Sequence, residues 1–227
     1  MGFLDLFKKK ETTKEPYVSF VVVDEVKGPY ANFEKKLLKK SLILLVIGRR
    51  GSGKTALGFK FLELFHNMSK KKCHIVGYND VKLPFWVKKI DDVQHAKINS
   101  VVLIDEGALA FSSRDSMKDA NKMISRIMAV ARHKNLTLIF ISQNSAMIDV
   151  NILRLVDSLV LKEPSLLQSR FERKALRDIY TEVHDSFKGV ETKAAHFFIY
   201  DDDFQGLMTY GLPSFWSDKI STSFKNK

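Results

Sequence analysis

The sequence predicts an α/β fold, a three-layer sandwich with a mainly parallel central sheet. Short apolar runs alternate with helical segments along the chain, and this alternation is typical of parallel strands joined by helical crossovers. A length of 227 residues with 45% hydrophobic content suffices for one α/β domain with a full core. We therefore expect a single domain over residues 16–217, with flexible ends at 1–15 and 218–227.

The strand-like segments are short, apolar and bounded by turns or charges. The run "LILLVIG" (42–48) is continuously apolar, as in a central strand covered on both faces. Residues 81–96 are expected to form a loop with a helical end, and residues after 203 to lead into a polar tail. The expected strands are 17–26, 42–48, 73–78, 101–107, 136–143, 157–163 and 196–203.

The helical segments show apolar residues at helical spacing. The segment from Lys54 to about Lys70 places Leu57, Phe61, Leu64 and Phe65 on one face, and the segment 116–133 places Met123, Ile127 and Val130 on one face. The expected helices are 32–40, 54–70, 116–133 and 165–184.

The stretch "GRRGSGKT" (48–55) fits the P-loop, or Walker A, pattern G-x-x-x-x-G-K-[ST] and lies between an expected strand and an expected helix. Glycines let backbone N–H groups surround phosphates, and the helix N-terminus adds positive potential. Lys54 should reach the β- and γ-phosphates, and Thr55 should bind Mg²⁺. The alternative is an ordinary glycine-rich turn. The expected nucleotide-binding residues are Gly48, Arg49, Arg50, Gly51, Ser52, Gly53, Lys54, Thr55 and Ala56.

The stretch "VVLIDEG" (101–107) resembles a Walker B strand, because it carries two acids to its carboxyl end. Asp105 would hold Mg²⁺ through water, and Glu106 would polarise the attacking water. A kinase does not need the second acid, since its acceptor is a substrate hydroxyl. The alternative is a helix-capping Asp105 beside a surface Glu106.

The apolar run "LTLIFISQ" (136–143) ends in Gln143. A neutral amide can donate to a γ-phosphate oxygen and accept from water. If this strand lies beside the P-loop strand, Gln143 could sense whether the γ-phosphate is present. Together with Lys54 and Glu106 it points to an ATPase that uses ATP and Mg²⁺ as cofactors.

The ordered set of motifs resembles the FtsK/HerA-type P-loop ATPases, which include DNA translocases, conjugation ATPases and viral genome-packaging ATPases. The resemblance covers about residues 40–164. It is carried by the P-loop, by "VVLIDEG", by "LIFISQ" and by "ARHKNLTL" before it. It implies a RecA-like P-loop NTPase fold.

The resemblance also implies a homo-oligomeric ring, usually a hexamer, in which an arginine reaches the neighbour's nucleotide. Arg132 is the best match for that catalytic arginine, and Arg154 and Arg170 are the reserves. A cation delivered across a subunit boundary can neutralise charge in the transition state. The alternative is that Arg132 only interacts with the carboxyl end of its own helix.

The charge balance indicates a polyanionic partner. The chain has 37 basic against 26 acidic residues, a net +11, which favours DNA, RNA or an acidic membrane. Arg114, Lys118 and Lys122 in the segment 112–122 could line a ring pore and contact phosphates; a solvated surface is the alternative. The single Cys73 excludes an intramolecular disulfide framework.

The sequence therefore predicts an ATP-hydrolysing motor that translocates double-stranded DNA and packages a viral genome into a capsid. Capsid or membrane portal proteins are further expected partners. The alternative is a membrane-associated virion-assembly or secretion ATPase that resembles the filamentous-phage morphogenesis proteins, which the lack of an 18-residue apolar stretch disfavours. A nucleotide switch or small-molecule kinase is disfavoured by Glu106 with Gln143. We expect the protein in the host cytoplasm or with the virion.

Overall fold

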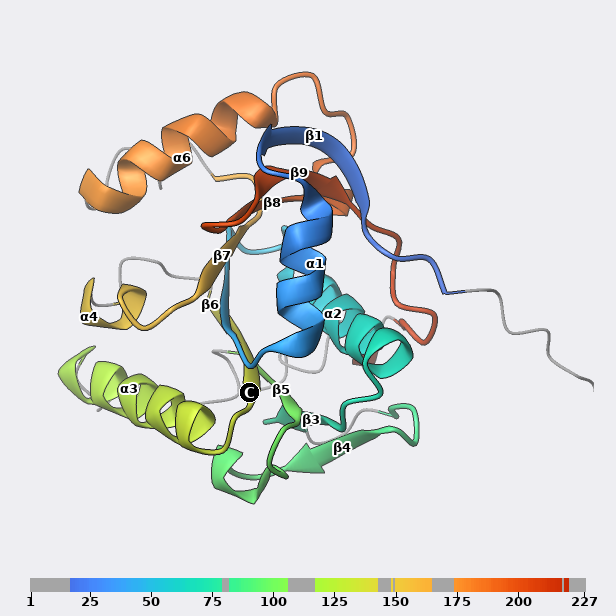
Figure 1. Cartoon of the computed structure of the whole chain (residues 1–227), viewed down its shortest axis with the longest axis vertical. Coiled ribbons are helices and arrows are strands. Elements are labelled where there is room, and N and C mark those ends of the chain that lie inside the picture. The colour runs from blue at the N-terminus through green and yellow to red at the C-terminus, as the bar shows by residue number, and fades with distance from the viewer. Residues whose placement is uncertain are drawn as a thin grey trace, which may run out of the picture.

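The described residues form one mixed sheet with helices on both faces (Figure 1). Its strand order is β1-β9-β8-β7-β2-β6-β5-β3-β4. The predicted three-layer α/β sandwich is thereby confirmed, and six of these nine strands form a parallel block. The computed structural model describes residues 17–78, 82–105, 117–142, 148, 150–164, 174–217 and 219–220.

The parallel block contains every strand of the predicted nucleotide motifs. β2 lies between β7 and β6, and each of its five residues is buried, as a continuous apolar run predicts. β5 lies on the far side of β6. In sheet order the parallel strands are β7 (Ser158–Leu161), β2 (Ile43–Ile47), β6 (Thr137–Ser142), β5 (Val101–Asp105), β3 (Cys73–Val76) and β4 (Val87–Ile90).

The other end of the sheet is antiparallel. β8 (His196–Tyr200) pairs with β7, β9 (Gln205–Thr209) pairs with β8, and β1 (Val21–Lys27) pairs with β9. β1 is an edge strand, most of its residues are exposed, and its register against β9 shifts twice. Such irregularities twist an edge strand and discourage pairing with another chain.

The helices divide between the two faces of the sheet (Figure 1). α1 and α2 pack on one face, and α3 and α6 contribute to a second apolar cluster on the other. The helical elements are α1 (Tyr30–Lys39), α2 (Lys54–Met68), η2 (Val93–His95), α3 (Met117–His133), α4 (Val150–Leu153), α6 (Lys174–Ser186) and η5 (Lys193–Ala195).

The P-loop helix α2 is buried on all sides. Eleven of its residues are buried, including Lys60 and Glu63, which form an ion pair of 2.8 Å. Gly58 allows its close approach to the sheet, because a Cβ there would lie 2.8 Å from both Ile141 Cδ1 and Leu103 Cδ1. The predicted single apolar face of this helix was therefore too narrow, since a helix in a domain core is apolar all round.

Two strands were not predicted. β4 carries Lys88 and Lys89 on an edge, so its sequence resembles a loop, and β9 contains Gly206 in a segment expected to lead to a tail. The predicted face of α3 was also partly wrong: Met123 is exposed, whereas Ile124, Ile127 and Met128 are buried. Near the C-terminus, Ile220 is fully buried in the core.

Candidate functional site

The carboxyl ends of β2, β6 and β5 meet at one edge of the sheet. Ile47 pairs with Ser142, and Asp105 pairs with Ile141, so the residues that follow these strands begin at the same edge. Glu106 and Gln143, predicted as the catalytic acid and the γ-phosphate sensor, lie outside the described residues. The expected position of the Gln143 strand, directly beside the P-loop strand, is confirmed.

The loop between β2 and α2 has the backbone conformation that its glycines permit. Gly53 is the N-cap of α2 with φ +87°, in the left-handed region that other residues rarely adopt. Lys54 is buried, and its Nζ donates to the carbonyls of Gly48 and Arg49 at 2.8 and 2.9 Å. The lysine therefore crosses its own loop at the N-terminus of a 15-residue helix, where anions are stabilised.

Thr55 and Asp105 contact each other directly. Thr55 Oγ1 donates to Asp105 Oδ2 at 3.0 Å, and Tyr78 OH donates to the same oxygen at 3.5 Å. Burial, together with the charge of Asp105, raises the pKa of Tyr78 well above its usual value, so the phenol remains a donor. A hydroxyl and one carboxylate are oxygen ligands of the kind with which Mg²⁺ completes its shell beside phosphates. Thr55 and Asp105 thus fit the predicted Mg²⁺ site.

The remaining loop residues divide into exposed and buried. Arg49 and Arg50 are exposed, and Arg49 Nη2 lies 3.6 Å from Glu163 Oε2. Ala56, in the first turn of α2, is buried and belongs to a core cluster. The Ser52 hydroxyl is buried and has no hydrogen-bond partner among the described residues.

Lys162 and Tyr210 belong to this site and were not predicted from the sequence. Lys162 follows β7, and its backbone N–H donates to Ile47 O at 2.8 Å, directly before the loop. Tyr210 follows β9, and its hydroxyl donates to Gly53 O at 3.0 Å. A lysine after an apolar strand resembles a surface residue, so only the neighbourhood of β7 and β2 in the sheet reveals it.

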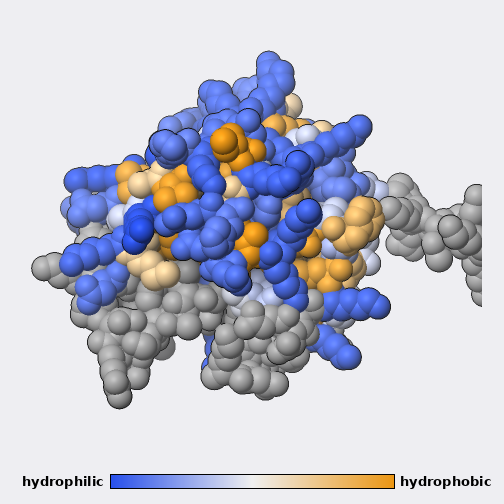
Figure 2. Space-filling view, turned by 90° about the horizontal axis from the view of Figure 1, so that it is seen from below, coloured by the Kyte–Doolittle hydropathy of each residue, from blue (hydrophilic) through white to orange (hydrophobic). Residues whose placement is uncertain are grey.

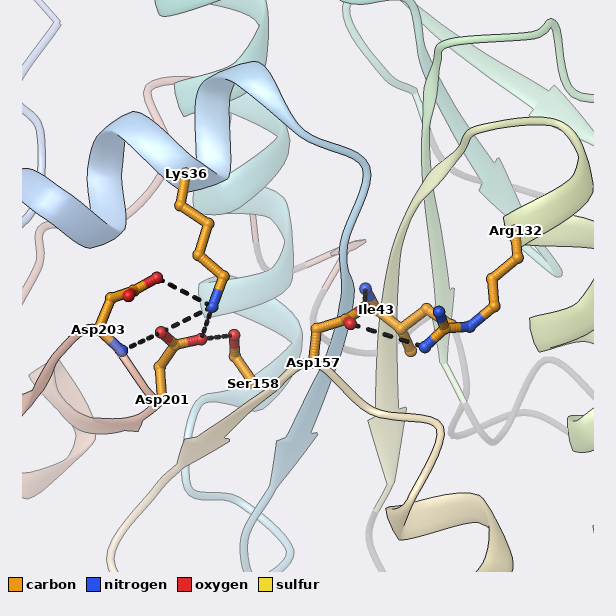
Figure 3. A network of polar contacts seen from close by, with 7 residues as sticks. All are labelled: Lys36, Ile43, Arg132, Asp157, Ser158, Asp201 and Asp203. Carbon is orange, nitrogen blue, oxygen red and sulfur yellow. Dashed lines mark hydrogen bonds and ion pairs between the residues drawn. The ribbon is translucent and has the colours of Figure 1, made fainter.

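Arg132 lies at the opposite, amino-terminal edge of the sheet (Figure 3). Its Nη2 donates to Leu155 O at 2.8 Å and lies 3.6 Å from Asp157 Oδ1. Asp157 also accepts a bond of 2.8 Å from Ile43 N, at the start of β2. Because β2 separates Arg132 from the P-loop of the same chain, a role at a nucleotide requires the nucleotide of a neighbouring subunit.

The structure says less about a role for the other basic residues predicted from the sequence. Arg154 is exposed in the turn after α4, at the same amino-terminal edge as Arg132. Lys122 is exposed on α3, 3.8 Å from Asp119. The side chains of Arg114, Lys118 and Arg170 lie outside the described residues.

The sequence matches the model of the family described as Novel STAND NTPase 3 over residues 29–151. This span holds the P-loop, Asp105 and β6, and it is more than half of the chain. The chain belongs to the Novel STAND NTPase 3 family. The phosphate-binding loop, Lys54 and the Thr55–Asp105 pair would together form a nucleoside triphosphate site.

Solved structures share the fold of this NTPase. The genome packaging NTPase B204 from Sulfolobus turreted icosahedral virus 2, in complex with AMPPCP, has a TM-score of 0.52 at 17% identity, over 76% of this chain and 98% of that one. The DNA-packaging ATPase B204 from Sulfolobus turreted icosahedral virus has 0.53 at 20% identity, over 78% and 100%. The pCW3 conjugation coupling protein TcpA, with ATPgS, has 0.51 at 13% identity, over 96% and 73%.

These neighbours have the fold expected from the resemblance to packaging and conjugation ATPases, and at these identities they establish the fold alone. No curated protein sequence matches the chain. Within the described residues, no helix is both long enough and apolar enough to span a membrane.

Proposed function

We propose that this NTPase hydrolyses ATP with Mg²⁺ and uses the energy to translocate double-stranded DNA. One observation carries the proposal: β2, β6 and β5 end together, next to Lys54 and the Thr55–Asp105 pair. This arrangement supplies a phosphate cradle, a cation site and two strand ends from which further side chains can reach a γ-phosphate. Mg²⁺, when bound, would neutralise phosphate charge.

The chain's own residues would divide the work as follows. Lys54 would exchange its loop carbonyls for phosphate oxygens, since charge-assisted bonds to phosphate are stronger than bonds to neutral acceptors. Glu106, which directly follows Asp105, would orient and deprotonate the attacking water. Gln143, directly after Ser142, would contact the γ-phosphate and report its loss.

The DNA part of the proposal rests on the charge and on the neighbours. Two neighbours are described as packaging a genome or DNA, and a third as a conjugation coupling protein. The surface seen from below the view of Figure 1, towards β4 and α3, is mainly hydrophilic (Figure 2). Exposed basic residues on β4 and α3 include Lys88, Lys89, Lys122 and Arg126, which suits phosphate contacts without sequence specificity.

The ring and the cargo complete the proposal. In a homo-oligomeric ring, built as a hexamer, Arg132 would face the next subunit's nucleotide. The cargo would be a viral genome entering a capsid, with the protein acting in the host cytoplasm or on the virion.

The test is ATP turnover with and without linear double-stranded DNA at two salt concentrations. We expect DNA to stimulate turnover severalfold at low salt and less at high salt, because counterion release drives phosphate contacts. Glu106→Gln should bind ATP as wild type does and lose turnover by at least about 100-fold. Asp91→Asn, at an exposed acid outside the site, is the matched control. Stimulation by lipid vesicles instead of DNA would reject the motor in favour of a membrane-associated ATPase.

A further inference from the structure

Lys162 is a second buried lysine at the phosphate-binding loop. Its side chain is 1% exposed, although lysine is almost never fully buried without a partner. A Cβ placed on Gly48 would lie 2.6 Å from Lys162 Cβ, so the lysine stem packs directly against the first residue of the loop.

The ammonium group is held by neutral acceptors. Lys162 Nζ donates to Ala194 O at 2.6 Å and to Tyr210 OH at 3.4 Å, and it lies 4.8 Å from the centre of the Tyr210 ring. Among the described residues no carboxylate lies within ion-pair distance of Nζ. The adjacent carboxylate, Glu163, contacts Arg49 and Lys193 instead.

The same group of atoms reaches the last glycine of the loop. Tyr210 OH donates to Gly53 O at 3.0 Å, and a Cβ on Gly53 would be 3.2 Å from that hydroxyl and 3.7 Å from Lys162 Nζ. Gly53 is the N-cap of α2, directly before Lys54. Lys162 and Tyr210 thus connect the phosphate cradle to η5 and to the end of β9.

We propose that Lys162 is a positioning residue for the nucleotide: it fixes Gly53 through Tyr210 and takes up a proton when a nucleoside triphosphate binds. This inference rests on the proposed nucleotide site. The ligand supplies the negative charge that the described surroundings of Nζ lack, so binding and protonation favour each other.

The direction of the effect follows from the charges around Nζ. Burial first, and the charge of Lys54 second, lower the pKa of Lys162 to about 7. A phosphate charge within about 8 Å would raise that pKa by more than about one unit. Below pH 7 the ammonium is charged with or without nucleotide, whereas above pH 7 binding must draw a proton from solution. Affinity should therefore fall as the pH rises from 7 to 9.

The titratable groups that face Lys162 are Lys54 from α2 and Tyr210 after β9. Arg49 and Lys193 lie around the adjacent carboxylate of Glu163. Burial raises the pKa of Tyr210, so its phenol stays protonated from pH 7 to 9. The nucleotide's own terminal phosphate ionises near pH 6, below this window. The remaining groups are the same in a Lys162 variant and in wild type. The difference in proton uptake between the two proteins therefore reports Lys162.

The experiment is calorimetric titration of the full chain with a non-hydrolysable ATP analogue and Mg²⁺, in two buffers of different ionisation enthalpy. At pH 8 we expect wild type to take up about half a proton or more per nucleotide, and affinity to fall about fivefold or more between pH 7 and 9. Lys162→Met should take up no proton at this residue, and its nucleotide affinity should not change with pH. Lys162→Arg, which stays charged, should keep the affinity and also show a flat profile.

Tyr210→Phe provides a test that does not depend on the folding of the Lys162 variants. It removes the hydroxyl that joins Nζ to Gly53 and keeps the ring. We expect weaker binding, by about fivefold, with proton uptake retained.

Binding without proton uptake, or the same uptake in Lys162→Met, would overturn the role of Lys162 and leave the nucleotide site intact. Absence of any nucleotide binding by wild type would reject the proposed function, and the inference with it.

Discussion

Lys162 and the cations at the opposite edge of the parallel sheet have different partners. At the amino-terminal edge, Lys36 lies 2.8 Å from Asp201, and Arg132 lies 3.6 Å from Asp157 (Figure 3). At the carboxyl edge, Lys162 donates to Ala194 O, and no described carboxylate lies within ion-pair distance of its Nζ. A cation paired with a carboxylate is satisfied by the fold, whereas one that donates to neutral acceptors gains more from an added anion. Lys36 therefore stabilises the fold through its carboxylate, whereas Lys162 would gain from a bound anion.

The largest effect on nucleotide binding is expected at Lys54, the lysine of the phosphate-binding loop at the carboxyl edge. Lys54→Ala should weaken ATP binding about 100-fold, because charge-assisted bonds to phosphate are lost, and it should abolish turnover. Fluorescent-nucleotide titration measures the loss of binding. The thermal midpoint checks that the variant still folds. Lys39→Ala, at an exposed lysine on α1, is the control, and equal weakening by both variants would contradict the assignment.

Lys36 should show the opposite behaviour, with an effect on folding and none on nucleotide binding. The Asp201 side chain is 0% exposed and also accepts from Ser158 Oγ and Asp203 N. Lys36→Met leaves that carboxylate buried without its cation, which should cost about 2–3 kcal/mol of unfolding free energy. Denaturant unfolding measures it.

Lys35→Met, on the exposed side of α1, is the matched control for Lys36→Met, and an equal loss in both would contradict the buried ion pair. The pH dependence gives a second check. Burial lowers the pKa of Lys36, but the hydrogen bond and charge of Asp201 outweigh it and raise the pKa above 10.5. The stabilisation is therefore complete below pH 10.5 and is lost as the pH rises through the raised pKa.

The smallest effect on folding is expected at Arg132. Its side chain is about half exposed, and solvent screens such ion pairs, so Arg132→Ala should change the unfolding free energy by less than about 1 kcal/mol. A role at the neighbouring subunit would appear only in turnover. Mixtures of Arg132→Ala and Glu106→Gln subunits should then regain activity, whereas Arg177→Ala, at an exposed arginine on α6, should be as active as wild type. If no mixing ratio restores turnover, Arg132 does not act at the neighbouring subunit, and its contacts with Leu155 and Asp157 are structural.

The sequence predicted the parallel strands whose side chains are buried on both faces. β2, β5 and β6 are continuous apolar runs, and their length and turn signals place them to within a few residues. β4 was not predicted because two of its four residues are exposed lysines, so this strand at the edge of the sheet has the composition of a loop.

Only those residues of the candidate site that lie within one sequence motif could be predicted. Lys54 and Thr55 follow from a local pattern, but Lys162 is more than 100 positions away. It reaches the loop only because β7 is the other neighbour of β2. Strand order depends on packing between distant segments, and a single sequence does not display it.

Gly58 has a mechanical consequence for the domain. By letting α2 sit against Ile141 and Leu103, it joins the helix that begins at Lys54 to the strands that end at Ser142 and Asp105. These three tips are thus fixed to one stiff block. A displacement of one tip would therefore carry the other two with it.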